Sequence, residues 1–409
     1  MPYVLGVDVG SGHTTAALNR HDEDEVWVLP LDAVTPSVHS VLYLTDDDAV
    51  LVGRDALARA EAEPDRVARG FVDRIGDPVP PLVGGRPCPA EVLTAALVCW
   101  VVDRAAEIEG DGPERVVLTH PASWGPHRRA LLDGALRQAG LPDVLLLPKP
   151  VAAAETHAAG HPVAAGDAVA VCDLGEHTGC GAVTHLGPAG FELVSRAEAG
   201  EHVAGARFDD ALVAHVLAEL ERAPADLDPE DEDVRAVLAE LRAACRTAKE
   251  TLSSATEAVV PTPLLGPPSS VLIPRSRFEE LIAPAVHRTV DMLLQAIRAA
   301  GGARVTAVTL VGGSARVPLV AELVMAASPV RVVVDADPAT AVARGAALAA
   351  RRAPDPSVRP VRLPEQREHV DPDAPTQPPR PPVEVAPLDV PLRGARRWRS
   401  AGRARRRAG

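Results

Sequence analysis

Three segments of this chain end a run of apolar and β-branched residues at a glycine turn, where backbone N–H groups can approach a phosphate. They are Gly6–Ser11, Val171–Thr178, and Val308–Pro318, which holds Gly312, Gly313 and Ser314. Adjacent glycines remove the Cβ atoms that keep a bound group away from the backbone. The residues that follow can open a helix, whose free N–H groups favour a phosphate. One such turn alone is explained equally well as a structural turn, but three on one chain predict a nucleotide clamp.

Asp8 and Asp173 stand at the ends of the first two of these strands, each beside its glycine turn. Mg²⁺ bound with a nucleotide keeps several waters and needs one or two carboxylates besides the phosphate oxygens. The pair therefore predicts a Mg²⁺ site in which both carboxylates act indirectly, through water. The simpler alternative, in which each aspartate caps its own turn, stays open.

The order of predicted elements repeats once along the chain. A strand–strand–helix–strand–helix order begins at residue 3 and again at residue 168. Apolar periodicity predicts helices over 90–109, 126–139, 150–159, 206–221, 231–254, 277–300 and 339–351. The mixed acidic and basic stretch 55–70 is also predicted to be helical. The duplication predicts an α/β fold of two lobes that face one another across a ligand cleft. We expect residues 1–165 and 335–352 to form lobe I and residues 166–334 to form lobe II.

The composition narrows the classes of function. The 409 residues are enough for two lobes with cores of their own. Residues 1–350 carry 28 basic and 49 acidic side chains, a net charge of -21, which argues against general binding of nucleic acid by this part. The five cysteines show no paired or metal-ligand spacing. The sequence begins with a strand pattern and has no apolar run near the ~20 residues of a membrane helix, so we expect no transmembrane segment and a cytoplasmic protein.

The sequence changes character after residue 351. Residues 354–391 contain 12 prolines and little apolar periodicity, which predicts a disordered tail over 353–409. Arg393–Gly409 carries eight arginines and no acidic residue. Such a cluster suits an anionic surface, either a membrane or a nucleic acid. A solvated tail held against the acidic lobes is the alternative.

The chain resembles the nucleotide-binding domain of the DnaK-type, 70-kilodalton heat-shock chaperones, within the actin-like ATPase superfamily. The likeness covers residues 3 to about 351. Gly6–Thr14 and Asp173–Thr178 are similar to the two phosphate loops, and Leu310–Pro318 to the adenosine segment. Stretches specific to the chaperones are matched by Phe208-Asp209, Leu241–Ser254 and Arg275–Leu281. The resemblance implies a duplicated actin-like ATPase fold with ATP or ADP, accompanied by Mg²⁺, in the cleft.

The resemblance also implies which residues contact the nucleotide. They are Gly10, Ser11, Gly12, Lys149, Gly175, Thr178, Gly205, Lys249, Ser253, Gly312, Gly313, Ser314 and Arg316. Arg316 is similar to the arginine that stacks on adenine, and Lys249 and Ser253 to residues at the ribose or adenine. Arg246 and Glu250 exchange the charges that the family has at these positions.

Several positions depart from the family pattern. Leu57 stands where the family has a lysine that points at the transferred phosphate, and Lys149 stands where it has the catalytic glutamate. The second phosphate loop carries Glu176 and His177 in place of two glycines, and Cys180 in place of an aspartate. Asp8 and Asp173 are the catalytic candidates that remain. Because positioning groups supply most of the catalysis of phosphoryl transfer, we expect weak or absent hydrolysis.

We therefore expect a heat-shock-chaperone-like, ATP/ADP-binding protein that acts as a nucleotide-dependent conformational switch, without the chaperones' substrate-binding domain. A co-chaperone or regulatory protein is the expected partner. Two alternatives stay open. One is an active chaperone-type ATPase that works with separate partners, and the other is a nucleotide-free pseudo-ATPase scaffold.

Overall fold

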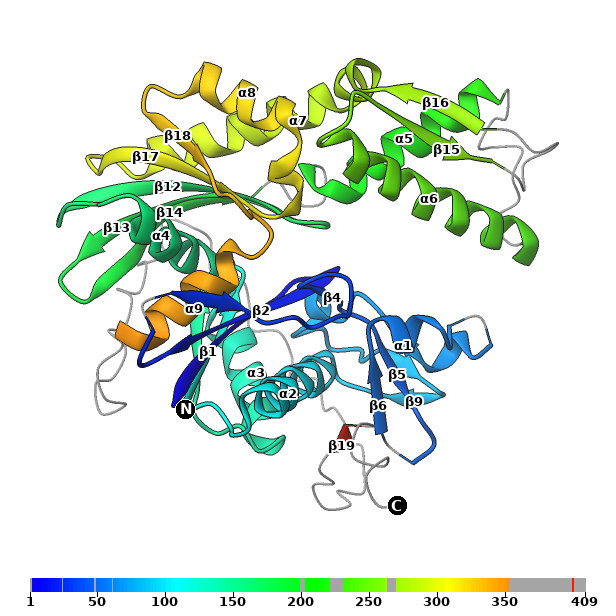
Figure 1. Ribbon diagram of the computed structural model, residues 1–409, viewed down its shortest axis with the longest axis horizontal. Coiled ribbons are helices and arrows are strands. Elements are labelled where there is room, and N and C mark those ends of the chain that lie inside the picture. The colour runs from blue at the N-terminus through cyan, green and yellow to red at the C-terminus, as the bar shows by residue number, and fades with distance from the viewer. Residues whose placement is uncertain are drawn as a thin grey trace, which may run out of the picture.

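A computed structural model describes residues 2–23, 25–47, 49–60, 62–198, 203–220, 231–262, 270–352 and 399–400 of the chain. Two mixed β-sheets, one in each half, dominate the fold (Figure 1). The first sheet has the order β11-β10-β1-β2-β3, and β4 pairs with β2. Its strands are β1 (Tyr3–Val9), β2 (His13–Arg20), β3 (Val26–Val28), β4 (Val38–His39), β10 (Arg115–His120) and β11 (Val144–Pro148).

The second sheet repeats the same plan with the order β14-β13-β12-β17-β18. Its strands are β12 (Asp167–Leu174), β13 (Gly179–Gly187), β14 (Gly190–Glu198), β17 (Arg304–Val311) and β18 (Arg331–Val334). In each sheet the first strand forms an antiparallel hairpin on one side and pairs with a parallel strand on the other. Asp8 lies opposite Thr15 in the first hairpin, and Asp173 lies opposite Cys180 in the second. The duplication predicted from the sequence is therefore present in the strand pairing.

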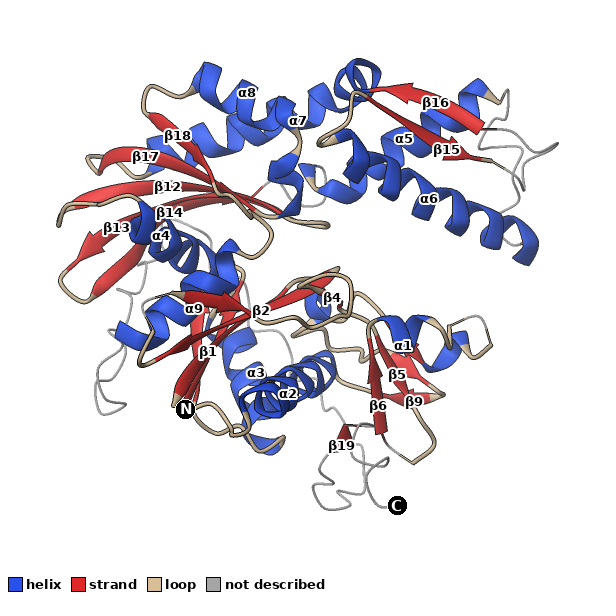
Figure 2. Ribbon diagram, viewed as in Figure 1, coloured by secondary structure: helices blue, strands red, loops and turns tan. Residues whose placement is uncertain are grey.

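Helices cover both sheets, and two of them lie between the sheets (Figure 2). The helices are α1 (Arg54–Leu57), α2 (Ala90–Glu109), α3 (Pro126–Gln138), α4 (Lys149–Gly160), α5 (Gly205–Glu219), α6 (Glu232–Leu252), α7 (Arg275–Ala299), α8 (Pro318–Ala327) and α9 (Ala341–Arg352). Helix α4 packs against α9. Strands of both sheets contact α4, and strands β1, β2, β3 and β10 of the first sheet contact α9. A Cβ on Gly345 would lie 1.7 Å from the carbonyl oxygen of Ala152, so the two helices cross at backbone contact.

Each half of the molecule has its own apolar core. The first core joins β1, β2, α2 and α3 and is closed by large side chains such as Phe71 and Leu97. In the second core, Phe208 of α5 meets Phe278 of α7 edge to face, with ring centroids 6.5 Å apart. These two phenylalanines belong to separate stretches that resemble the chaperones. Their contact joins the two stretches in the second core.

Smaller elements complete the two halves. They are β5 (Leu42–Leu44), β6 (Ala49–Val52), β7 (Val67–Ala68), β8 (Leu82–Val83), β9 (Arg86–Pro87), β15 (Glu257–Pro261), β16 (Ser270–Pro274) and β19 (Arg399–Ser400), with 3₁₀ turns at Pro64–Arg66, Val72–Arg74 and Gly313–Arg316. The helix predicted over 55–70 is wrong. The helix α1 ends at Leu57, and Pro64 starts a separate 3₁₀ turn that leads into β7. A continuous helix over 55–70 would place Pro64 in its interior, where proline lacks the N–H that the helix needs.

Two expectations from the sequence concern the tail and the membrane. Past residue 352 the structure describes Arg399–Ser400, which form β19 and pair in parallel with β6. The other residues of the predicted disordered tail lie outside the described residues. Within the described ranges, no helix combines the length and the apolar character needed to span a bilayer.

Candidate nucleotide site

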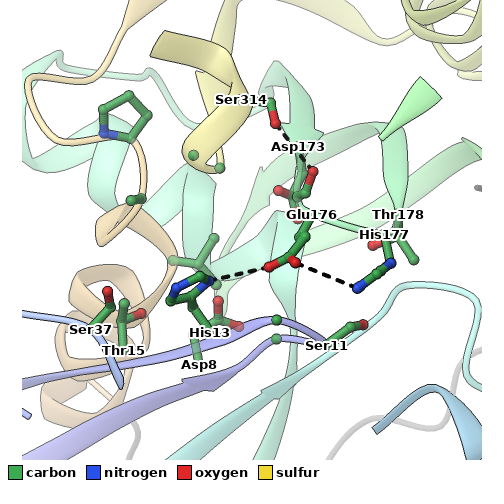
Figure 3. A pocket seen from close by; sticks show the side chains of 18 of the residues that line it. Asp8, Ser11, His13, Thr15, Ser37, Asp173, Glu176, His177, Thr178 and Ser314 are labelled. Atoms are coloured by element: carbon green, nitrogen blue, oxygen red, sulfur yellow. Dashed lines mark hydrogen bonds and ion pairs between the residues drawn. The ribbon is translucent and has the colours of Figure 1, made fainter. Parts of the chain in front are cut away.

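A cavity of about 300 Å³ lies between the two sheets, at the ends of β1 and β12 (Figure 3). Both glycine hairpins, the start of α4, one face of α6 and the turn after β17 line it. The predicted site residues on its wall are Asp8, Gly10, Ser11, Gly12, Lys149, Asp173, Gly175, Thr178, Lys249, Ser253, Gly312, Gly313, Ser314 and Arg316. Segments from five separate parts of the sequence therefore meet at one site.

The first glycine loop is held in a tight hairpin. The N–H of Gly10 donates to the carbonyl oxygen of His13 at 3.0 Å. Ser11 Oγ donates to Asp73 Oδ1 at 2.6 Å, which ties the loop tip to the 3₁₀ turn Val72–Arg74. This bond leaves the hydroxyl of Ser11 already engaged within the protein.

The second glycine loop and the turn after β17 support each other. The N–H of Gly175 donates to the carbonyl oxygen of Thr178 at 3.0 Å, and Ser314 Oγ donates to the carbonyl oxygen of Gly175 at 3.3 Å. Gly312 has φ +87°, and a Cβ there would lie 2.4 Å from the carbonyl oxygen of Leu174. Glycine is required at this position for both reasons.

The centre of the cavity holds an ion pair between the first strand and α4. Lys149 Nζ lies 3.1 Å from Asp8 Oδ1, and both side chains are mostly buried. Thr119 Oγ1, at the end of β10, donates to the same oxygen of Asp8. Burial by itself would lower the pKa of Lys149, but the carboxylates of Asp8 and Asp173 outweigh it and raise that pKa. Lys149 therefore faces into the cavity as a fixed positive charge.

Asp173 faces the same centre from the second sheet. Burial raises the pKa of the Asp173 carboxyl to about 6; the charge of Lys149 lowers that pKa, and the charge of Asp8 raises it further. The two carboxylates were predicted to hold Mg²⁺ through water. An ammonium group already contacts one oxygen of Asp8, so a hydrated divalent cation at this place would compete with Lys149 for the same carboxylate. Across the described residues, no cluster of three or more histidine, cysteine or acidic side chains could hold a metal ion.

Glu176 reaches from the second glycine loop across to the first (Figure 3). Its Oε2 lies 3.3 Å from His13 Nδ1, and Arg246 donates to its Oε1 at 2.6 Å. A Cβ on Gly12 would lie 1.6 Å from Glu176 Oε2, so the carboxylate rests directly on the backbone of Gly12. His177 Nε2 lies 3.7 Å from Glu176 Oε1. Burial alone would raise the pKa of Glu176, but the hydrogen bond with His13 and the charges of Arg246, His13 and His177 lower it to about 2. A negative charge thus occupies the space between the two glycine loops.

The side of the cavity that the resemblance assigns to adenosine is built on α6. Lys249 Nζ lies 2.8 Å from Asp209 Oδ1, and it donates to the carbonyl oxygen of Gly205 at 3.3 Å. Arg316 pairs with Asp337 and is half exposed at the rim. Ser253 Oγ donates back to the carbonyl oxygen of Lys249 at 3.3 Å. Arg316 and the α6 residues Lys249 and Glu250 line the same cavity.

The comparison with known proteins identifies the family. The family model described as "Hsp70 protein" matches residues 82–364. The chain belongs to the Hsp70 family. Its described part is an Hsp70-type nucleotide-binding domain with the actin-like ATPase fold, which confirms the resemblance and the fold class predicted from the sequence.

Curated relatives in the Hsp70 family are chaperones of the HscA type. The chain is 32% identical over 370 residues to a chaperone protein HscA homolog of Burkholderia multivorans, covering 85% of this chain and 58% of the relative. It is 33% identical over 375 residues to a chaperone protein HscA homolog of Bordetella pertussis, covering 85% of this chain and 57% of the relative. The chain thus spans less than two thirds of the length of these Hsp70 relatives.

Two residues named from the Hsp70 resemblance lie away from the cavity wall. Leu57, at the position of the family's lysine, packs with Val41, Tyr43 and Ala56 in a small apolar cluster. Gly205, at the start of α5, holds the second glycine loop in place, since its N–H donates to the carbonyl oxygen of Gly175 at 3.0 Å. A Cβ on Gly205 would lie 2.5 Å from Ser314 Oγ, so its role is to let the two segments approach.

Sequence reasoning missed four residues that shape the site of this Hsp70 relative. They are His13, Asp73, Thr119 and Asp209. His13 directly follows Gly12, and Asp209 belongs to a stretch already compared with the chaperones, so the sequence motifs could have indicated both residues. Asp73 and Thr119 carried none, because their roles depend on which distant segment folds against them.

Proposed function

We propose that this Hsp70-family chain binds ATP or ADP as a conformational switch and hydrolyses ATP weakly or not at all. Lobe I (1–165 and 335–352) and lobe II (166–334) would close on the nucleotide. The observation that carries the proposal is the Lys149–Asp8 ion pair at 3.1 Å. Lys149 stands at the position where the resemblance implies a catalytic glutamate.

The ion pair supports binding and argues against catalysis. An ammonium group attracts phosphate oxygens, so Lys149 favours occupancy of the cavity. Orienting a water for attack on phosphorus needs an acceptor such as a carboxylate, and an ammonium group is a donor without acceptor capacity. Leu57 is packed in an apolar cluster and brings no charge to the transferred phosphate. Nucleotide binding is therefore favoured over turnover.

The wall of the cavity supports an adenosine nucleotide as the ligand. The turn Gly312–Ser314 is intact, and Lys249, Ser253 and Arg316 line the same cavity. Glu176 opposes the phosphates by its negative charge, so the affinity is expected to be lower than in chaperones with glycine at this position. A co-chaperone or regulatory protein as partner, a role in stress response, the cytoplasm as location and an anionic surface as target of the arginine-rich tail remain predictions.

Thermal unfolding of the full chain with and without nucleotide tests the binding half of the proposal. ATP or ADP at ~100 times its dissociation constant should stabilise the folded state by about 2.7 kcal/mol. No shift at millimolar nucleotide would favour the nucleotide-free scaffold. Steady-state phosphate release, measured beside an HscA-type chaperone, tests the other half. Release at the rate of the chaperone would favour the active ATPase.

A further inference from the structure

The positive charges on the wall of the cavity are divided between two regions. On the adenosine side, Lys249 pairs with Asp209, Arg246 with Glu176, and Arg316 with Asp337. At the centre, Lys149 pairs with Asp8. Lys149 is thus the cation placed between the two strand-end aspartates that were predicted to hold Mg²⁺.

Several contacts fix the position of this ammonium group. Lys149 is the first residue of α4, between Pro148 and Pro150, so the backbone that carries it is restricted. Asp8 Oδ1 accepts from Thr119 as well as from Lys149, which holds the carboxylate in place on β1. The charge is therefore tethered at the end of the sheet rather than moving freely in the cleft.

The identity of residue 149 changes the charge of the centre. A glutamate there would give three carboxylates, together with Asp8 and Asp173, and such a set attracts a divalent cation. Lysine leaves two carboxylates and one ammonium group, which repels a second cation and neutralises part of the acidic charge. The same ammonium group can also neutralise the charge of a phosphate oxygen, as Mg²⁺ does in nucleotide sites.

We propose that Lys149 takes the place of the divalent cation, so that the cavity binds a nucleoside diphosphate or triphosphate in its metal-free form. This inference rests on the proposed function and deepens it, because it names the form of the ligand. The ammonium group would be shared between Asp8 and a phosphate oxygen. Phosphate charge would be neutralised by a side chain that cannot dissociate from the protein.

Calorimetric titration of the full chain with ADP, once in excess EDTA and once in excess MgCl₂, tests the inference. The dissociation constants of the wild type in the two buffers should differ by less than about fivefold. A larger gain from Mg²⁺ would overturn the inference alone. Absence of binding in both buffers would overturn the proposed function as well.

Two variants make the test specific to residue 149. Lys149→Glu should bind ADP at least about tenfold more weakly in EDTA than in MgCl₂, because the third carboxylate restores the demand for a metal ion. Lys149→Met removes the charge with a side chain of similar length, and it should lose about tenfold in EDTA relative to the wild type. Lys149→Met with wild-type affinity in EDTA would overturn the inference. Thermal unfolding of each variant without ligand shows whether it is folded, and the comparison of buffers for the wild type needs no variant.

Discussion

Single side chains decide the chemistry of this Hsp70-type site more than the fold does. Lys149 and Glu176 both line the cavity, and their opposite charges are expected to have opposite effects on the affinity for phosphate. Lys149 attracts phosphate oxygens. Glu176 presents a carboxylate between the glycine loops, bound to His13 and Arg246 and resting on Gly12. The affinity for nucleotide therefore depends on the balance between attraction by Lys149 and repulsion by Glu176.

Replacing Glu176 by glycine should raise the affinity for ADP by about tenfold. The change removes a negative charge from the phosphate space and frees Arg246 to pair with a phosphate oxygen. Calorimetric titration measures the effect. Glu250→Gln, which neutralises another carboxylate on the same cavity wall, is the matched control and should change the affinity far less. Equal effects of the two variants would show that Glu176 has no special position.

The carboxyl of Asp173 predicts a dependence of stability on pH. Its pKa is raised from 3.8 to about 6, so the folded state holds this proton more tightly than the unfolded state. Wild-type stability therefore falls as the pH rises from 3.8 through 6, and the penalty is fully present above 6. Asp173→Asn should be more stable than the wild type at pH 8, by an amount on the order of 1–3 kcal/mol, and the gain should shrink toward pH 4. Urea unfolding of both proteins across this range measures the difference. A gain that is constant with pH would contradict the prediction.

At the scale of elements, the crossing of α4 and α9 positions the site. Helix α4 begins at Lys149, in the cavity, and its Ala152 carbonyl meets Gly345 of α9. Thr156 Oγ1 donates to the carbonyl oxygen of Ala341 at 2.6 Å, which fixes the register of the two helices. Any change that separates these helices moves the start of α4, and with it the ammonium group of Lys149.

Gly345→Ala should therefore destabilise the protein by at least about 2 kcal/mol, although alanine is the better helix former. The new Cβ would meet the backbone of α4, which cannot turn aside as a side chain could. Gly134→Ala, inside α3, is the matched control because nothing lies within 4 Å of its Cβ. This control should stabilise the protein by about 0.5–1 kcal/mol. Chemical unfolding of both variants gives the comparison, and two changes of the same sign would refute the proposed contact.

At the scale of the whole molecule, the sequence predicts the duplicated order of strands and helices well, because local patterns of apolar residues and glycine turns determine these elements. The strand ends at Asp8 and Asp173 and the helix Ala90–Glu109 follow from apolar periodicity and glycine turns. The helix predicted over 55–70 fails because mixed charged and apolar residues carry little periodicity and Pro64 interrupts them. Two interactions depend on tertiary packing, and no local pattern encodes them: Glu176 with His13, which joins the two halves, and Ser11 with Asp73, which lies within the first half.

The full chain is expected to hold ATP without rapidly cleaving it. A single-turnover experiment tests this most directly: the full chain in excess is mixed with radiolabelled ATP, quenched after increasing times, and the bound nucleotide is identified. An HscA-type chaperone is treated in the same way for reference. The nucleotide is expected to be bound and to be recovered still as ATP long after the chaperone has converted its own to ADP. Conversion to ADP at the rate of the chaperone would contradict this expectation.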